Sequence, residues 1–515
     1  MLLINDKQIL RKTGLLLLTS ILLILAFLNS QTSILAWVAI VPLFYAIENA
    51  STKASFFIFY FFGIFFFGGI LYWLTYVTKL GYVLFVLFLA LFFGIFGLFT
   101  SIFFQKFKKS TLAFLLCLII PALWVSIEFL RGFIFTGFPW CLLGYSQYRY
   151  PPLIQIADIT GAYGVSFLIM MGNFVIYSFL SAIFDKKGPM PKLQTAIFTA
   201  FFAFCVFYGY FRLSEEKSGD EIKISVVQGG VQQSAKWDPS CREYIMGIYE
   251  TLIKEAAGNE ADLVIWPETA IPGFVDEDDI ALWLRRIQEK NRKPLLSGAV
   301  TYISENGIDS FFNSAVLFTE DGDIRRKYDK IHLVPFGEYI PFEARMPFFR
   351  GSINTEIGNY TAGKEFTIFE LTSETGKKSR YGALICFEDI FPELARGFAR
   401  GGADFLINIT NDAWFGESGE QLQHAQASVF RAVENRLSVV RAANNGFSCY
   451  ISPKGVIEDY IGKDGGSIYK KGRKTFRVEI AKKRSIYTTY GDIFIYACLA
   501  FLAACYFVDF LRPRI

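Results

Sequence analysis

Apolar residues are concentrated in the first two-fifths of this 515-residue chain and again at its end, while polar residues fill the region between. Most apolar stretches reach the roughly 17–25 residues that a helix needs to cross about 30 Å of hydrocarbon. We therefore expect an eight-helix transmembrane bundle, with a seven-span domain over residues 1–212 and a last span at 489–511. The seven earlier stretches lie at about 13–29, 33–48, 55–76, 81–104, 111–130, 161–183 and 194–212.

Lysine and arginine residues in the short loops predict the orientation of these spans, because such loops stay in the cytoplasm. With the N-terminus in the cytoplasm, the cytoplasmic side carries Lys53, Lys106, Lys108, Lys109, Lys186, Lys187, Lys192, Arg512 and Arg514. The stretch at 33–48 is short for a span, but a seven-span count would break this charge pattern. Residues 220–484 are then expected outside the cytoplasmic membrane.

Within 220–484, short apolar runs alternate with helical patterns. The expected strands are Lys223–Gln228, Leu263–Pro267, Leu295–Tyr302, Asn313–Phe318, Gly382–Phe387, Phe405–Ile409, Val439–Ala443, Ser448–Ser452 and Thr475–Ile480, and the expected helices are 239–257, 277–290, 391–401 and 420–437. Strand layers with helices between them predict an α/β or α+β sandwich that is large enough for its own core.

Composition narrows the class of protein. Hydrophobic residues make up 53% of the chain and charged residues 19%, which indicates an integral membrane protein. The net charge of +4 offers no basic excess for a phosphate backbone, so no nucleic-acid partner is expected. The eight cysteines are scattered and form no CxxC pair, and the only histidines are His332 and His424. We therefore expect neither a disulfide framework nor a metal site.

Three segments of the polar region place reactive residues at probable strand ends: Glu268, Lys330 and Cys386. A thiolate is a strong nucleophile, but a free cysteine needs a base or a positive field to form one. A carboxylate can shuttle that proton, and an ammonium can stabilise an oxyanion. Taken singly, each residue has an ordinary alternative: a core cysteine, a surface lysine or a loop glutamate.

Taken together and in this order, the three segments resemble the Glu–Lys–Cys triad of the nitrilase (carbon–nitrogen hydrolase) superfamily, which implies an αββα sandwich. The added membrane spans make the chain similar to the bacterial apolipoprotein N-acyltransferase family. The stretches that carry this resemblance include Gly144-Tyr145-Ser146-Gln147, Gly161–Phe167, Val227-Gln228-Gly229, Lys236-Trp237, Pro335–Pro341 and Asn411–Gly416.

The resemblance implies that Cys386 is the nucleophile, Glu268 the general base and Lys330 the oxyanion stabiliser. Glu338 then matches a second, supporting glutamate, and Glu388 the acidic residue two places after the nucleophile. Phe387 departs from the tyrosine expected in many relatives, so a role that needs a hydroxyl cannot be assigned to it, while its backbone N–H remains an oxyanion donor.

The resemblance further implies a ping-pong acyl transfer without metal or cofactor. A phospholipid would donate its sn-1 acyl chain to Cys386, and the N-terminal diacylglyceryl-cysteine of a lipoprotein would accept it. The implied setting is the bacterial inner membrane, with the catalytic domain in the periplasm and a monomer as the expected state. Two alternatives remain at this point: a membrane-tethered nitrilase-type amidase, and a non-catalytic lipid-binding membrane protein.

Aromatic residues near the triad are candidates for lipid contact, with packing in the core as the alternative. Trp237, Trp414, Phe348 and Phe349 form this group. The last two belong to a stretch at 341–365 with little strand or helix pattern, and loops of this length are commonly lids or binding loops. His424 is expected on a helix face and Asn411-Asp412 in a turn, while the role of His332 is left open.

Overall fold

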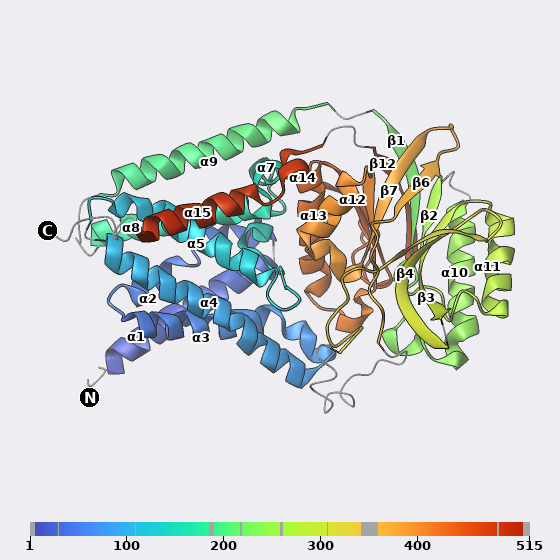
Figure 1. Cartoon of the computed structure of the whole chain (residues 1–515), viewed down its shortest axis with the longest axis horizontal. Coiled ribbons are helices and arrows are strands. Elements are labelled where there is room, and N and C mark those ends of the chain that lie inside the picture. Colours follow the sequence, from blue (N-terminus) through green and yellow to red (C-terminus); the bar gives the residue numbers. More distant parts are fainter. Residues whose placement is uncertain are drawn as a thin grey trace. The chain divides into compact units, whose positions relative to one another are not determined.

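The computed structural model describes residues 6–28, 30–108, 110–184, 190–216, 219–257, 261–305, 307–340, 359–480 and 484–507. The chain divides into two compact units (Figure 1). Met1–Glu215 and Tyr490–Ile515 make up the first, here called the helical unit, and Glu216–Thr489 make up the second, the sandwich unit. This confirms a mixed α/β chain with a bundle of apolar helices.

Six helical segments of the described residues are long and apolar enough to cross a membrane: Ile9–Leu28, Thr52–Ile70, Lys79–Phe107, Ala113–Arg131, Ala162–Phe184 and Lys192–Leu213. They correspond to α1 (Asp6–Leu28), α3 (Thr52–Ile70), α4 (Lys79–Phe107), η3 (Ala113–Leu115) with α5 (Leu116–Arg131), α8 (Ala162–Phe184) and α9 (Lys192–Leu213). Two shorter apolar helical segments, Gln31–Ile47 and Ile493–Phe507, occupy the positions of the other two expected spans. The count of eight is therefore approximate.

The stretch expected as a span at 33–48 is not one continuous helix. A 3-10 helix, η1 (Ser30–Trp37), is followed by a turn and by the short α2 (Val41–Ile47), which has Pro42 in its first turn. Asn173 of α8 bonds to both sides of this break: its amide N–H donates to the Ala36 carbonyl at 2.8 Å, and its amide oxygen accepts from the Ile40 N–H at 2.8 Å. Irregular backbone at membrane depth is tolerated where protein groups satisfy it in this way.

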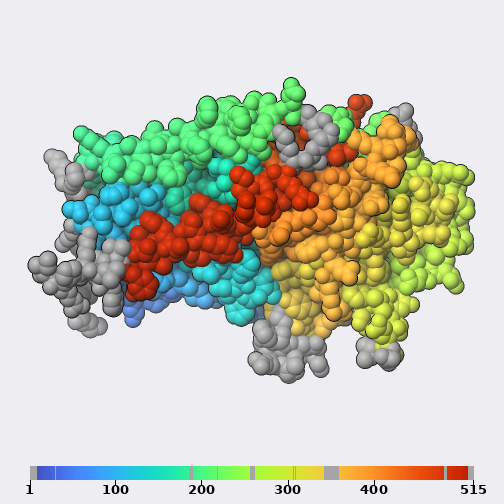
Figure 2. All heavy atoms as spheres, turned by 45° about the horizontal axis from the view of Figure 1, so that its top comes forward, coloured from blue at the N-terminus to red at the C-terminus, as the bar shows by residue number. Residues whose placement is uncertain are grey.

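Close helix packing organises the rest of the helical unit. A Cβ on Gly97 of α4 would lie 2.6 Å from the Ser55 carbonyl oxygen of α3, so this glycine lets the two backbones approach. The last helix, α15 (Ile493–Phe507), runs along the surface of the same unit (Figure 2, red). Its Phe494 and Tyr496 rings meet Phe167 of α8 and Phe129 of α5, so the chain's last helix belongs to the same bundle as its first helices.

Two six-stranded sheets form the sandwich unit. The first has the order β12-β1-β2-β3-β4-β5 and the second β11-β10-β9-β8-β7-β6. The strands are β1 (Glu221–Gln228), β2 (Leu263–Ile265), β3 (Leu295–Glu305), β4 (Ile308–Phe318), β5 (Ile324–Asp329), β6 (Ile368–Thr372), β7 (Lys378–Ile385), β8 (Phe405–Thr410), β9 (Ser438–Ala443), β10 (Cys449–Ile451), β11 (Ile457–Tyr460) and β12 (Gly472–Glu479).

Helices cover the outer face of each sheet (Figure 1). α10 (Arg242–Ala257) and α11 (Asp278–Asn291) lie on the first sheet, while α12 (Pro392–Arg400) and α13 (Glu420–Asn435) lie on the second. The sheets face each other and are joined by side chains such as Ser448, whose hydroxyl donates to the Gln228 side-chain oxygen at 2.6 Å. The αββα sandwich expected from the resemblance is confirmed.

Three strands, β5, β6 and β11, were not expected, and several expected strands, among them the one before Cys386, were too long at an end. The three lie at the edges of their sheets, where strands are short and carry charged residues that weaken the apolar pattern. The expected strand Gly382–Phe387 ends at Ile385, because Cys386 takes a positive φ of 52° and begins the 3-10 helix η9 (Cys386–Ile390). Cys386 and Phe387 therefore lie in a turn.

Candidate active site

Glu268 lies in the turn after β2, and its backbone is held tightly. Thr269 has a positive φ of 47°, and the Ala270 N–H donates to the Gly298 carbonyl at 3.0 Å. A Cβ at Gly298 would lie only 2.4 Å from the Glu268 Cα, so only glycine on β3 leaves room for this turn. The carboxylate of Glu268 is consequently presented from a fixed backbone.

Lys330 follows β5, and its ammonium lies between two carboxylates. The Nζ atom is 2.9 Å from Oε1 of Glu338 and 3.7 Å from Oε1 of Glu268, and the lysine is only 1% exposed. Asn313 of β4 completes the group, because its side-chain N–H groups donate to Oε1 of Glu268 and to Oε1 of Glu338, each at 2.8 Å. These four residues form one buried cluster of hydrogen-bonded charges.

The two carboxylates decide the charge state of Lys330. Burial alone would lower the pKa of its ammonium, but the attraction of Glu338 and then of Glu268 outweighs burial and raises that pKa above its ordinary value. Lys330 therefore carries a permanent positive charge across the physiological pH range, as a group that stabilises an oxyanion must.

Cys386 is a free cysteine, half-buried, at the first position of η9. Its left-handed φ is costly for a residue other than glycine and persists only where surrounding contacts enforce it. Asn408 supplies one of these contacts by donating its side-chain N–H to the Cys386 carbonyl at 3.0 Å. Such strained backbone is concentrated at functional sites.

Electrostatics connect Cys386 with the buried cluster. Burial and then the Glu268 carboxylate raise the pKa of the Cys386 thiol well above its usual value, and the Lys330 ammonium opposes that rise. The thiol is therefore protonated at neutral pH and needs a base to become a nucleophile. Glu268 is a carboxylate of the same site that can take this proton.

Glu388 ties the segment after Lys330 to the turn that carries Cys386. Its Oε1 accepts from the backbone N–H groups of Ile331 at 2.8 Å and His332 at 3.1 Å, and its Oε2 accepts from the Ile385 N–H at 2.8 Å. Burial raises the pKa of Glu388 to about 7, while its hydrogen bonds with Ile385 and His332 oppose the rise. Its role in the geometry is to hold two chain segments together.

The aromatic candidates have different surroundings. Phe387 is half-buried and packs edge-on against Phe391, with ring centroids 5.3 Å apart. Trp237 is half-buried, whereas Trp414, in η10 (Asp412–Phe415), is 44% exposed. Phe348 and Phe349, with most of the stretch at 341–365, lie outside the described residues.

His332 is half-buried, whereas His424 is buried. The His332 ring stacks on Phe391 with centroids 3.8 Å apart. His424, on α13 as expected, is buried and ion-paired, with Nε2 2.7 Å from Asp389 and Nδ1 3.3 Å from Asp412. Asp412 is fully buried in a 3-10 turn, so the turn expected at Asn411-Asp412 contributes a buried carboxylate.

Asp412, Glu420 and His424 bring three donor atoms close enough to hold a metal ion. Two positively charged side chains already lie beside these residues, however. Arg441 Nη1 is 2.6 Å from Asp389. Asp389 also raises the pKa of His424 to about 10, against the effect of burial. A protonated imidazole cannot ligate a metal. The group is therefore part of a larger buried ion cluster that also contains Asp389 and Arg441.

Two polar residues of this site were given no role from the sequence, although Lys236 lies in one of the stretches that carry the resemblance. Asn313 is a buried asparagine within an apolar strand, a signal that could have been used because buried amides need partners. Lys236 is buried, and its Nζ donates to the Glu268 carbonyl at 2.9 Å. A lysine in a loop of polar residues gives no sign of such burial.

Comparisons with known proteins agree with this architecture. The chain matches the family models "Apolipoprotein N-acyltransferase N-terminal domain" over residues 19–175 and "Carbon-nitrogen hydrolase" over residues 223–461. The apolipoprotein N-acyltransferase of Geobacter metallireducens is 36% identical, over 97% of this chain and 95% of its own. That of Haemophilus influenzae is 30% identical, over 77% of this chain and 75% of its own.

Among solved structures, Nit3 of Saccharomyces cerevisiae, from branch 10 of the nitrilase superfamily, aligns with 50% of this chain and 90% of its own, at 20% identity and a TM-score of 0.37. The assignment itself depends on the match along nearly the whole chain, which includes the apolar helices as well as the sandwich. By that match, the chain belongs to the apolipoprotein N-acyltransferase family, a family of membrane acyltransferases.

Proposed function

We propose that this protein transfers a fatty acyl chain from a phospholipid to the N-terminal diacylglyceryl-cysteine of a lipoprotein, through a thioester on Cys386. The proposal depends on the buried cluster of Glu268, Lys330, Glu338 and Asn313. Two members of this cluster, Glu268 and Lys330, interact electrostatically with the Cys386 thiol. The membrane helices and the names of the relatives support a lipid donor and a lipoprotein acceptor.

In the first half-reaction, Glu268 accepts the thiol proton and the sulfur of Cys386 attacks the ester carbonyl. The tetrahedral oxyanion is stabilised by the Lys330 ammonium and by the Phe387 backbone N–H. Collapse of this intermediate breaks the ester C–O bond, and Glu268 returns the proton to the departing oxygen. The products are a lysophospholipid and an S-acyl cysteine.

In the second half-reaction, the α-amino group of the lipoprotein attacks the thioester. Glu268 takes a proton from the attacking nitrogen, the C–S bond breaks, and the proton returns to sulfur. The thiol is thereby regenerated, and the acyl chain ends in an amide. Dividing the exchange into two steps is what covalent catalysis contributes.

A test of the donor half-reaction is mass spectrometry of the full-length protein after incubation with phospholipid vesicles. We expect one fatty-acyl mass on Cys386, removable by neutral hydroxylamine. Cys386→Ala should lack it, whereas Cys241→Ala, which removes the other half-buried cysteine, should keep it. An acyl mass that persists in Cys386→Ala would refute the nucleophile.

The same preparations separate the alternatives. A membrane-tethered amidase would release ammonia from small aliphatic amides and form no acyl-enzyme from phospholipid. A non-catalytic lipid-binding protein would do neither. Transfer of the labelled chain from the acyl-enzyme to a diacylated lipopeptide is the outcome specific to the proposed acyltransferase.

We also propose that the sandwich unit lies on the periplasmic side of the bacterial inner membrane. It is joined to apolar helices at both ends, since α9 ends at Leu213 before β1 begins and α15 begins at Ile493 after β12 ends. The short loops that are rich in lysine are expected in the cytoplasm, on the opposite side of the membrane from the sandwich unit. A reporter that requires export should therefore be active when fused after Ser218 and inactive after Lys187, and the reverse pattern would contradict the orientation.

A further inference from the structure

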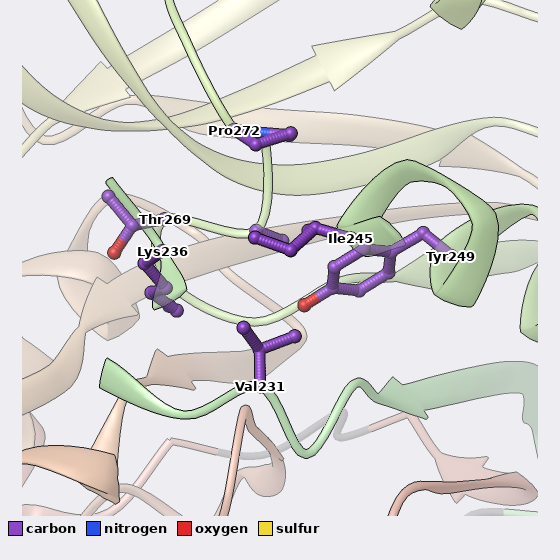
Figure 3. Close-up of a pocket in the computed structure, with 7 residues that line it drawn as sticks. Val231, Lys236, Ile245, Tyr249, Thr269 and Pro272 are labelled. Atoms are coloured by element: carbon purple, nitrogen blue, oxygen red, sulfur yellow. The ribbon is translucent and has the colours of Figure 1, made fainter. Parts of the chain in front are cut away.

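Lys236 is a second buried cation in the candidate active site. It follows the 3-10 helix η5 (Gln233–Ala235), and only 6% of it is exposed. Figure 3 shows Lys236 beside Thr269 on one side of a small pocket, with Tyr249 on the other. Among the described residues, the Glu268 carbonyl oxygen, 2.9 Å from Nζ, is the one hydrogen-bond acceptor that Lys236 reaches.

The side chain therefore contacts the backbone of the proposed base and leaves further N–H donors of a buried amine unused. Two ionisable groups face it, the Glu268 carboxylate and the Cys386 thiol, and both favour its protonated form. Lys330 and Glu338 belong to the same cluster around Glu268. Lys236 is not a member of that cluster, but it contacts the turn that carries Glu268.

The charges in the site during the reaction explain why a second buried ammonium would be useful there. In the resting site, Glu268 and Glu338 carry two negative charges, and Lys330 carries one positive charge. When Glu268 has taken the proton, Glu338 and the new charge on sulfur or on the oxyanion again leave two negative charges beside Lys330. A buried site with an unbalanced negative charge is costly, and a second ammonium near the sulfur removes the imbalance.

We propose that Lys236 is a positioning residue of the reaction, which holds the turn of Glu268 through its backbone carbonyl and supplies the second positive charge that balances the negative charge at Cys386. This inference rests on the proposed function only in taking Cys386 as the nucleophile. It assigns a role to a residue that is not part of the triad.

The two contributions of Lys236 depend on pH in different ways. Burial lowers the pKa of Lys236 from 10.5 to about 7, although Glu268 and then Cys386 oppose the decrease. The positive charge is therefore present below about pH 7 and is lost as the pH rises through that value. A neutral amine still donates a hydrogen bond, so the contact with the Glu268 carbonyl survives at higher pH.

The test uses the rate of alkylation of Cys386 by iodoacetamide in the full-length protein, since this rate follows the thiolate fraction and needs no lipid. A Cys241→Ala background removes the other half-buried cysteine. Lys236→Met deletes charge and donor, Lys236→Gln deletes the charge and keeps a donor, and Lys236→Arg keeps both. Lys474→Met, which removes a lysine paired with Asp459 at 2.8 Å, is the control.

At pH 6, we expect Lys236→Met and Lys236→Gln to react about tenfold more slowly than the parent, the effect of one pKa unit on thiolate fraction. This difference should shrink above pH 8, where the parent has lost the same charge. Lys236→Arg should react faster than Lys236→Gln at both pH values, and Lys474→Met should match the parent.

Equal rates in the parent and in Lys236→Gln at pH 6, or a loss of the same size at pH 6 and pH 8.5, would overturn the charge role of Lys236. If Lys236→Met does not fold, the comparison of Gln with Arg decides the question by itself. Acyl-enzyme formation is measured in parallel: its absence from the parent, with the alkylation pattern intact, would refute the proposed function and leave the inference about Lys236 standing.

Discussion

The hydroxyl of Tyr328 donates a 2.8 Å hydrogen bond to Oε1 of Glu388, and this bond crosses from one sheet of the sandwich to the other. Tyr328 lies in β5 of the first sheet, while Glu388 lies in η9, directly after β7 of the second. Both side chains are fully buried. This pair of side chains therefore joins the turn that carries Cys386 to the strand that leads to Lys330, together with the Ile331 and His332 N–H groups that donate to the same oxygen.

We predict that Tyr328→Phe destabilises the sandwich unit and slows acylation of Cys386. Removing one partner of a buried hydrogen bond costs about 1–3 kcal/mol. Tyr381→Phe is a matched control, because its buried hydroxyl has no hydrogen-bond partner among the described residues and its loss should be neutral or stabilising. Thermal unfolding and acyl-enzyme formation measure the two effects, and equal behaviour of the two variants would contradict the prediction.

The candidate residues were predicted from three segments taken together and in order along the chain, and an apolar run marks the position of only two of them, Glu268 and Cys386. Glu268 and Cys386 come after β2 and β7, whose last residues pack in the core, whereas Lys330 follows β5, whose first three residues are exposed. Cys386 was nevertheless expected to end a strand, and its positive φ shows otherwise. Apolar periodicity identifies where a strand lies, but it carries no information on the backbone conformation at a strand's end.

Residues whose roles depend on distant contacts were not predictable. Asn313 is separated from Glu268 by most of two strands and a helix, yet it donates to that residue's carboxylate at 2.8 Å. Asn173 stabilises a helix break more than a hundred positions before it in the chain. The sequence around each residue does not indicate which residue it will contact, because strand order and helix packing decide which side chains meet.

Replacing Asn313 by Asp should slow acyl-enzyme formation by adding a negative charge to the site, beyond any effect of lost packing. The new carboxylate would face Oε1 of Glu268 and Oε1 of Glu338, which now accept from the Asn313 amide. Repulsion among three carboxylates favours protonation of one of them, so Glu268 becomes a poorer base at neutral pH. We expect acyl-enzyme formation at pH 7 to fall by about 10²-fold, the lower range for loss of general-base catalysis.

The pH dependence of this variant is its distinguishing feature. Activity of Asn313→Asp should recover in part as the pH rises and the extra proton is lost, while Asn313→Ala, which removes the donor and adds no charge, should show no such recovery. Single-turnover acylation from pH 6 to pH 9 measures both. Parallel profiles for the two variants would exclude repulsion as the cause.

His424 should make stability depend on pH. Although burial disfavours the imidazolium, Asp389 raises the pKa of His424 from 6.5 to about 10, with Asp412 contributing and Arg441 opposing. Because the pKa is higher in the folded state, the stabilisation is fully present below about pH 6.5 and is lost as the pH rises through about 10. The total is a few kcal/mol, since one pKa unit corresponds to about 1.4 kcal/mol.

We therefore expect His424→Gln to lower the melting temperature most at pH 6.5, and the difference from the parent to shrink steadily toward pH 10. Titration of Glu388 near pH 7 is common to both proteins and cancels in the difference. Thermal unfolding at several pH values measures the trend. A difference that is constant over this range would show that the imidazole is neutral in the folded protein.

The break between η1 and α2 provides a prediction for the helical unit. In Asn173→Ala, the Ala36 carbonyl and the Ile40 N–H lose the partners that they have at 2.8 Å, and both are buried where water is scarce. Hydrogen bonds between membrane helices contribute about 0.6 kcal/mol on average and up to about 1.7 kcal/mol, so the loss of two should cost about 1–3 kcal/mol. Thr100→Val on α4 is the control, because the buried Thr100 hydroxyl has no hydrogen-bond partner in the part of the chain that the structure describes, and its replacement should be neutral. Thermal unfolding of the full-length protein in one detergent compares them. An Asn173→Ala protein as stable as Thr100→Val would mean that the break is satisfied by other groups, and that Asn173 does not hold η1 and α2 in place.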